Sequence, residues 1–173
     1  AGRKYLAPGL FGPCGYGLPS IIGAKIACPD TPVVGFAGDG AFGIAVTELT
    51  AIGRKEWPAI TMVVFRNYQW GAEKRNSTLW YDDNFVGTEL DTDVSYAGIA
   101  KACGLQGVQA RTMDELTAAL NKAVDDQMNR LAAAPHHFLE QLHEQLCVQC
   151  AFVGGEPKAT LGVDGRGRRD RLA

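Results

Sequence analysis

The sequence predicts an α/β protein with a doubly wound, mostly parallel sheet and helices on both faces. Three short apolar runs, at 33–37, 60–65 and 105–110, have the length of buried strands. Segments with helical propensity separate these runs, and a glycine-rich turn follows the first of them. Strands that alternate with helices in this way pair in parallel through helical crossovers, as in doubly wound folds.

The helices are expected from propensity and from signals at their ends. The segment 43–55 contains no proline, and Gly104 is a stop signal after an apolar segment. Asp114 and Glu115 lie where the first turn of a later helix would begin, and carboxylates there interact favourably with the helix dipole. In chain order, we expect helices at about 18–27, 43–55, 94–103 and 113–130.

Residues 68–92 carry few helix signals, so we expect a long loop between the second strand and the third helix. A loop of this length in a compact domain more often serves a site than merely connects two elements. Its large aromatic residues are expected to close over a ligand or to pack at a subunit interface; they are Trp70, Trp80, Tyr81 and Phe85.

Two motifs lie where the first two predicted strands end. Gly38-Asp39-Gly40-Ala41-Phe42-Gly43 follows the first strand, and Arg66-Asn67 follows the second. The 26 residues between Gly40 and Asn67 suffice for one helix and a returning parallel strand. Both motifs then open at one sheet edge, where α/β proteins bind ligands, and the glycine turn points backbone N–H groups at anions. The pair predicts one diphosphate site.

The spacing Gly38-x-Gly40-x-x-Gly43 also fits the dinucleotide fingerprint. Asp39 argues against that interpretation, because a carboxylate in the turn repels a diphosphate unless a cation stands between them. Arg66 at the end of the second strand would suit a 2′-phosphate, so an NADP-binding oxidoreductase domain remains an alternative.

A divalent cation makes the motifs compatible. Asp39 offers a carboxylate oxygen, Asn67 an amide oxygen, and the following loop a backbone carbonyl, a set that suits Mg²⁺ together with diphosphate oxygens and water. Taken singly, Asp39 is typical of a helix N-cap and Asn67 of a turn. Their joint position at two strand ends favours the metal site.

These residues resemble the thiamine diphosphate motif of the acetolactate synthase and pyruvate oxidase superfamily. Upstream, the stretch 12–19 resembles the segment that lines the cofactor pocket in these enzymes, with Cys14 contributing its backbone carbonyl. The resemblance implies Mg²⁺ ligands at Asp39, Asn67 and the backbone of Gln69. It implies a cofactor site made of Gly12, Cys14, Gly15, Gly38, Asp39, Gly40, Ala41, Phe42, Asn67, Gln69 and Gly71.

The runs 66–76 and 79–90 resemble one branch of this superfamily more closely. That resemblance implies conversion of sulfoacetaldehyde and phosphate to acetyl phosphate and sulfite, with an acetolactate synthase-like carboligase or decarboxylase as the alternative. Lys74, Arg75 and Asn76 lie just beyond the metal loop and are candidates for binding the sulfonate or phosphate. The alternative for the two cations is a solvated surface pair.

The resemblance also implies that this chain is a fragment of a larger one. In these enzymes an amino-terminal domain of a partner subunit supplies the glutamate that activates the cofactor, in a homodimer or homotetramer. We therefore assign no catalytic residue here, and Glu48 and Glu73 are expected to be ordinary helix-face and loop carboxylates. The fragment alone is expected to be inactive, and a non-catalytic role is its remaining alternative.

Composition excludes several classes of function. The 173 residues are 46% hydrophobic with a net charge of −2, enough for one core and without the basic surface of a nucleic-acid-binding protein. No apolar run approaches the roughly 20 residues of a membrane span, and no signal segment opens the chain. We expect a cytoplasmic protein with reduced cysteines.

The pattern of strands and helices changes after residue 130. An alanine-rich stretch ending in Pro135 intervenes where a buried strand is needed, and the last residues are rich in glycine and arginine. We therefore divide the chain into a cofactor domain, 1–130, and an aberrant, frameshifted or disordered tail, 131–173. Without a further strand, the sheet would be left with an unpaired edge.

Overall fold

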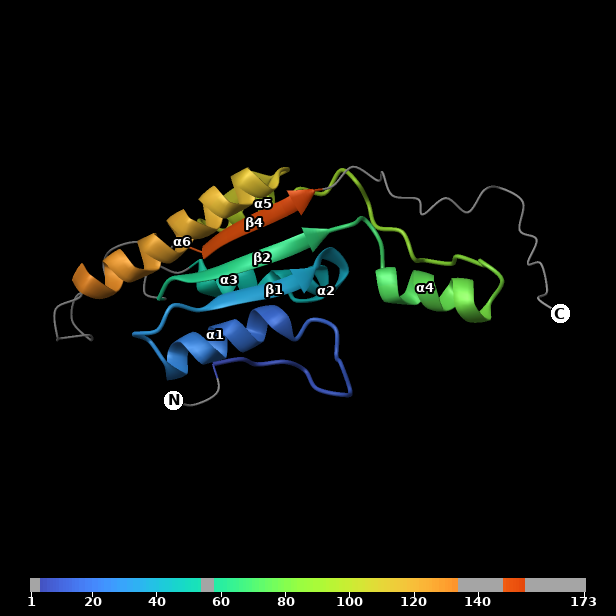
Figure 1. Cartoon of the computed structure of the whole chain (residues 1–173), viewed down its shortest axis with the longest axis horizontal. Helices are drawn as coiled ribbons and strands as arrows, with labels where there is room; N and C mark the ends of the chain where they lie inside the picture. Colours follow the sequence, from blue (N-terminus) through green and yellow to red (C-terminus); the bar gives the residue numbers. More distant parts are fainter. Residues whose placement is uncertain (1–3, 54–57, 134–147, 155–173) are drawn as a thin grey trace.

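The sheet of the computed structural model is parallel and has four strands in the order β1-β2-β4-β3. The structure describes residues 4–53, 58–133 and 148–154. The strands are β1 (Val34–Gly38), β2 (Ile60–Arg66), β3 (Gln106–Ala110) and β4 (Val148–Gly154). The predicted α/β fold with a parallel sheet is confirmed (Figure 1).

The helices cover both faces of the sheet. On one face, residues of α1, α2, α3 and α5 pack on Ile60, Met62 and Val64 of β2. On the other face, Leu116 of α6 packs on Val63 and Ala110. The helical elements are α1 (Gly17–Ala27), α2 (Asp39–Ile44), η1 (Val46–Glu48), α3 (Leu49–Ile52), α4 (Gly71–Trp80), α5 (Tyr96–Ala102) and α6 (Met113–Ala133).

The helix predicted at 43–55 is wrong in its start and its continuity. The chain enters α2 at Asp39, directly after β1, so Gly40 and Gly43 lie within the helix instead of before it. A short 3₁₀ turn, η1, then separates α2 from α3, which ends at Ile52. Glycine disfavours helix interiors by about 1 kcal/mol, and tertiary packing overrides that preference here.

The long loop predicted at 68–92 is also wrong in part, because it contains α4. None of the α4 residues is buried, so the helix has no apolar stripe to reveal it. Its first turn nevertheless contains good helix formers, Ala72 through Arg75. In Figure 1, α4 stands apart from the sheet, beyond the carboxyl end of β2.

A strand does follow residue 130. β4 pairs in parallel with β2 along its whole length, from Ile60↔Val148 to Arg66↔Gly154, and its other edge pairs with β3. Its sequence is short and apolar, but it follows a polar segment that hides it from pattern analysis. The boundary at residue 130 and the origin of the tail remain predictions.

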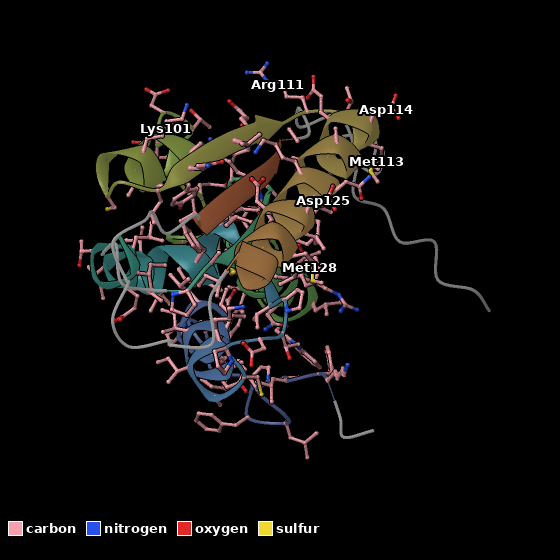
Figure 2. The ribbon with its side chains drawn as sticks, turned by 90° about the vertical axis from the view of Figure 1, so that its left-hand side faces the viewer. Lys101, Arg111, Met113, Asp114, Asp125 and Met128 are labelled. Carbon is pink, nitrogen blue, oxygen red and sulfur yellow. The ribbon has the colours of Figure 1, made fainter. Side chains whose placement is uncertain are left out.

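α6 is amphipathic. The buried side-chain amide of Gln127 on this helix forms hydrogen bonds with Val33, directly before β1. Gln127 is 2% exposed, and its Oε1 accepts a hydrogen bond from the Val33 N–H at 3.0 Å. Its Nε2 donates to Thr61 Oγ1 at 2.7 Å and to the Val33 carbonyl at 3.3 Å. Figure 2 labels the exposed side chains of this helix, Met113, Asp114, Asp125 and Met128.

Among the described residues, no helix combines the length and the apolarity required to cross a membrane.

We predict that Gln127→Leu lowers the free energy of unfolding by about 2–4 kcal/mol, because it removes the amide partner of the buried Thr61 hydroxyl and of the half-buried Val33 N–H. Urea denaturation measures the change. Gln109→Ala is the control, because Gln109 is exposed on β3 and its loss should change stability by less than about 0.5 kcal/mol. Equal stabilities of the two variants would contradict the role of the Gln127 amide.

Candidate functional site

The carboxyl ends of β1 and β2 border a pocket of about 400 Å³. This is the sheet edge at which parallel α/β folds bind ligands. The lining residues come from the segment before α1, the start of α2, the end of β2 and the start of α4. They are Cys14, Gly38, Asp39, Gly40, Ala41, Phe65, Arg66, Asn67, Gln69, Trp70, Gly71, Ala72 and Glu73.

Most of the residues predicted for the cofactor site line this pocket, and three do not: Gly12, Gly15 and Phe42. Gly15 has φ +85°, and a Cβ there would lie 2.9 Å from Ile44 Cγ2, so it is needed for backbone shape. Phe42 is 1% exposed and belongs to the core. The binding roles of the predicted residues remain predictions, whereas the proximity of the two motifs is observed.

Asp39 connects the ends of the two strands. Its side chain is 2% exposed, and Oδ2 accepts a hydrogen bond from the Tyr68 N–H at 2.8 Å. Oδ1 accepts from the Gly40 N–H at 3.1 Å. No ion pair found in the described part of the chain involves Asp39. A buried carboxylate is costly without a cation, so its place beside the pocket favours a positively charged ligand.

The loop after β2 has a distorted backbone that serves this contact. Tyr68 has φ +60°, which is unusual for a bulky residue, and its N–H donates to Asp39. Asn67 is exposed, and its Oδ1 accepts a hydrogen bond from the Gln69 N–H at 3.3 Å. The loop is fastened from outside, because the Trp70 N–H donates to the Thr88 carbonyl at 2.8 Å.

Trp70 forms one wall of the pocket directly against Gly40. A Cβ at Gly40 would lie 2.9–3.0 Å from three atoms of the Trp70 ring, so only glycine permits this approach. The prediction that Trp70 closes over the site is consistent with this position. Trp80 and Tyr81 are 76% and 67% exposed, and they do not line the pocket.

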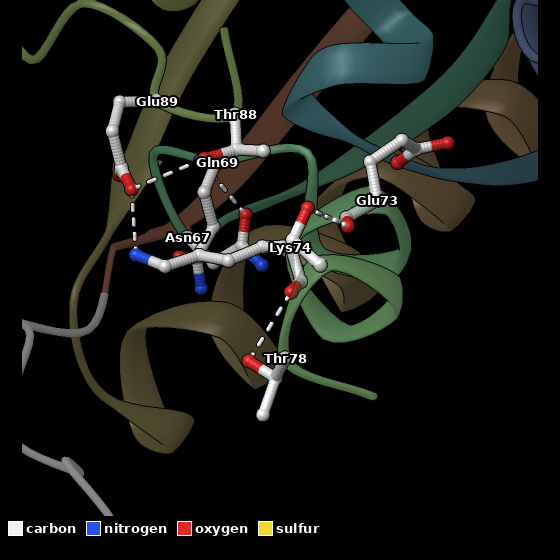
Figure 3. Close-up of polar contacts among 8 residues, drawn as sticks. Asn67, Gln69, Glu73, Lys74, Thr78, Thr88 and Glu89 are labelled. Atoms are coloured by element: carbon white, nitrogen blue, oxygen red, sulfur yellow. Dashed lines mark hydrogen bonds and ion pairs between the residues drawn. The ribbon is translucent and has the colours of Figure 1, made fainter. Parts of the chain in front are cut away.

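The predicted anion-binding residues lie on α4 and outside the pocket lining. Lys74 Nζ forms an ion pair with Glu89 Oε1 at 2.6 Å (Figure 3). It also lies 5.1 Å from the Phe85 ring centre. Arg75 and Asn76 are exposed. An anion would have to compete with Glu89 for Lys74, so the role of these three residues remains a prediction.

Sequence reasoning missed a cluster of polar and aromatic groups beside the pocket. The Arg66 guanidinium lies 4.3 Å from the Tyr68 ring centre and 5.8 Å from that of Tyr96, and its Nη2 donates to the Thr92 carbonyl at 2.8 Å. The Tyr96 hydroxyl donates to the Asp39 carbonyl at 3.2 Å. No motif signals Tyr96, which lies 57 residues from Asp39.

The pKa of the Tyr96 hydroxyl is raised above its ordinary value. Burial is the main cause, and the negative charge of Asp39 adds to it, whereas Arg66 acts in the opposite direction. Tyr96 is therefore a hydrogen-bond donor at neutral pH.

The fold and the paired strand ends define a cofactor-binding α/β domain, and comparison with known families assigns it. Residues 1–132 match the model of the thiamine pyrophosphate enzyme, C-terminal TPP binding domain. The chain belongs to this family. Thiamine pyrophosphate and thiamine diphosphate are two names for the same cofactor. No observation supports the dinucleotide interpretation of the glycine spacing.

Two curated relatives carry the same activity in their names. The chain is 89% identical over 127 residues to "Sulfoacetaldehyde acetyltransferase" of Rhodobacter capsulatus, which covers 73% of this chain and 22% of the relative. It is 73% identical over 163 residues to "Probable sulfoacetaldehyde acetyltransferase" of Rhizobium meliloti, covering 94% of this chain and 27% of the relative. The chain thus spans about a quarter of their length. The second alignment, being longer than 130 residues, reaches into the segment predicted as a tail.

Among solved structures, the fold is similar to that of a thiamine diphosphate-dependent 4-hydroxybenzoylformate decarboxylase of Rhodococcus jostii RHA1. The TM-score is 0.62 at 22% identity, and the match covers 83% of this chain and 24% of that one. At this identity the likeness concerns the fold alone.

We predict that Gly40→Ala displaces the Trp70 ring and lowers the free energy of unfolding by about 1 kcal/mol, because overpacking outweighs the gain in helix propensity. The Trp70 indole resonance in NMR spectra and urea denaturation measure the two effects. Gly38→Ala is the matched control, because a Cβ at Gly38 would meet no atom within 4 Å. An unshifted Trp70 resonance in Gly40→Ala would contradict the close approach.

Proposed function

We propose that this chain forms the cofactor-diphosphate half of an enzyme that converts sulfoacetaldehyde and phosphate to acetyl phosphate and sulfite, using thiamine diphosphate and Mg²⁺. The observation that supports it most is the buried Asp39 carboxylate, which lies without a cationic partner in the described residues and contacts the Asn67 loop beside the pocket. The family supports thiamine diphosphate as the cofactor, and the names of the two relatives support acetyl transfer from sulfoacetaldehyde.

The residues present fit a metal-bound diphosphate. Each carboxylate oxygen of Asp39 accepts one hydrogen bond from a backbone N–H, which leaves lone pairs available to a cation. We assign the metal to Asp39, to the Asn67 side-chain oxygen and to the backbone carbonyl of Gln69, with diphosphate oxygens and water completing the six ligands of Mg²⁺. Hard oxygen ligands of this kind suit Mg²⁺ better than transition metals.

In this proposal, the chain positions the cofactor and binds anions. Thiamine diphosphate, when bound, supplies the carbanion chemistry. Gly38 and Gly40 leave room at the strand end, Trp70 shields one side of the pocket from water, and Cys14 borders it from the segment before α1. We propose that Lys74, Arg75 and Asn76 bind the sulfonate or phosphate, which requires Lys74 to leave Glu89.

The remaining parts of the enzyme lie outside this chain in our proposal. We assign no catalytic residue here, and we place the activating glutamate in an amino-terminal domain of a partner subunit, within a cytoplasmic homodimer or homotetramer. Glu73 lines the pocket and Glu48 is exposed on η1, and neither has a feature that favours the activating role.

We predict that Asp39→Asn weakens Mg²⁺-dependent binding of thiamine diphosphate at least tenfold, because it removes the only anionic protein ligand of the proposed metal. Isothermal titration calorimetry on the 173-residue chain measures this, and EDTA should abolish wild-type binding. Asp125→Asn is the control, because Asp125 is exposed on α6 (Figure 2). Binding of NADPH without metal, or equal affinities in the two variants, would contradict the metal site.

The reaction itself is testable in a chimera. The 127 aligned residues of this chain replace the matching segment of the Rhodobacter capsulatus relative, to which they are 89% identical. We expect phosphate-dependent release of sulfite from sulfoacetaldehyde at a rate close to that of the parent. A folded chimera that binds thiamine diphosphate but releases no sulfite would move the assignment to another 2-oxo acid or aldehyde, such as the substrate of an acetolactate synthase-like carboligase.

A further inference from the structure

The Tyr96 side chain contacts residues of both motifs, Asp39 after β1 and Arg66 at the end of β2. Tyr96 is the first residue of α5, and Ser95 fixes its place as the helix N-cap by accepting a hydrogen bond from the Gly98 N–H at 3.1 Å. Serine in this position stabilises a helix start by about 1 kcal/mol. The backbone position from which the Tyr96 side chain extends is therefore fixed by the start of α5.

The first contact is with the chain that follows β1. The Tyr96 hydroxyl donates to the backbone carbonyl of Asp39 at 3.2 Å, and its ring meets the Phe42 ring edge-on, with centres 5.4 Å apart and planes at 90°. Edge-to-face pairs of this kind are favourable. Since Asp39 and Phe42 are both almost fully buried, Tyr96 holds the first turn of α2 at the hydroxyl and at the ring.

The second contact is with the chain that follows β2. The Arg66 guanidinium lies 4.3 Å from the centre of the Tyr68 ring and 5.8 Å from the centre of the Tyr96 ring. Arg66 and Tyr68 are the residues on either side of Asn67. Through these two contacts, Tyr96 helps to fix the position of Asp39 relative to Asn67, the two residues proposed to bind the metal through their side chains.

We propose that Tyr96 is a positioning residue, whose hydroxyl holds the Asp39 backbone so that the Asp39 carboxylate meets the Tyr68 N–H and the incoming metal. The proposal rests on the proposed function for its metal, but the hydroxyl's effect on the Asp39–Tyr68 contact does not depend on any ligand. A role in packing alone would need only the ring, because the contacts with Phe42 and Arg66 are ring contacts.

Tyr96→Phe separates these two roles, since it keeps the ring and removes the hydroxyl. In the 173-residue chain, we expect hydrogen exchange of the Tyr68 amide to become about fivefold to tenfold faster, the size of one lost hydrogen bond, while the amide of Val63 within β2 is unchanged. Tyr81→Phe is the control, because it makes the same chemical change at a residue that is 67% exposed.

Binding provides the second measurement. With Mg²⁺ present, Tyr96→Phe should weaken thiamine diphosphate binding by a similar factor, and Tyr81→Phe should not. An unchanged exchange rate at Tyr68, an equal increase at Tyr68 and Val63, or faster exchange with unchanged cofactor affinity would each overturn the proposal. A wild-type chain that fails to bind thiamine diphosphate would refute the cofactor assignment instead, and the Tyr68 exchange rate would still decide whether the hydroxyl holds Asp39.

Discussion

The hydrogen bond between the Asp39 carboxylate and the Tyr68 amide is the contact on which the site depends. It joins the ends of β1 and β2 at 2.8 Å, where otherwise two independent loops would leave the sheet. Tyr68 has a left-handed backbone at this contact, a conformation that costs of order 1–3 kcal/mol and persists only where the surroundings enforce it.

Several contacts hold Asp39 and the loop after β2 in this conformation. Residues 88–90 hold the loop through the Thr88 carbonyl, Arg66 is fixed by the Thr92 carbonyl, and Tyr96 supports Asp39 from α5. These partners come from the segment that returns from α4 to the sheet. The position of the site is therefore set by the parallel strands, whereas its precision is set by this returning segment.

The location of the site was predictable because it follows from one rule. Parallel strands place their carboxyl ends together, so a motif after each strand predicts that Asp39 and Asn67 lie near each other, as they do. The supporting contacts were not predictable, since the Tyr68 N–H is a backbone group and Tyr96 belongs to no motif. The helix α4 was not predicted because none of its residues is buried. The strand β4 was not predicted because a polar segment precedes it.

The position of β4 has a consequence for how the chain is made. β4 is the last described strand to be synthesised, yet it lies between β2 and β3, which have no contact with each other in the sheet order. On the ribosome, β1 and β2 can pair early, but β3 has no place until residues 148–154 have emerged. Until then, the nascent chain presents the unpaired backbone edge of β2, so chaperone protection and translation speed should matter most between the synthesis of β2 and that of β4.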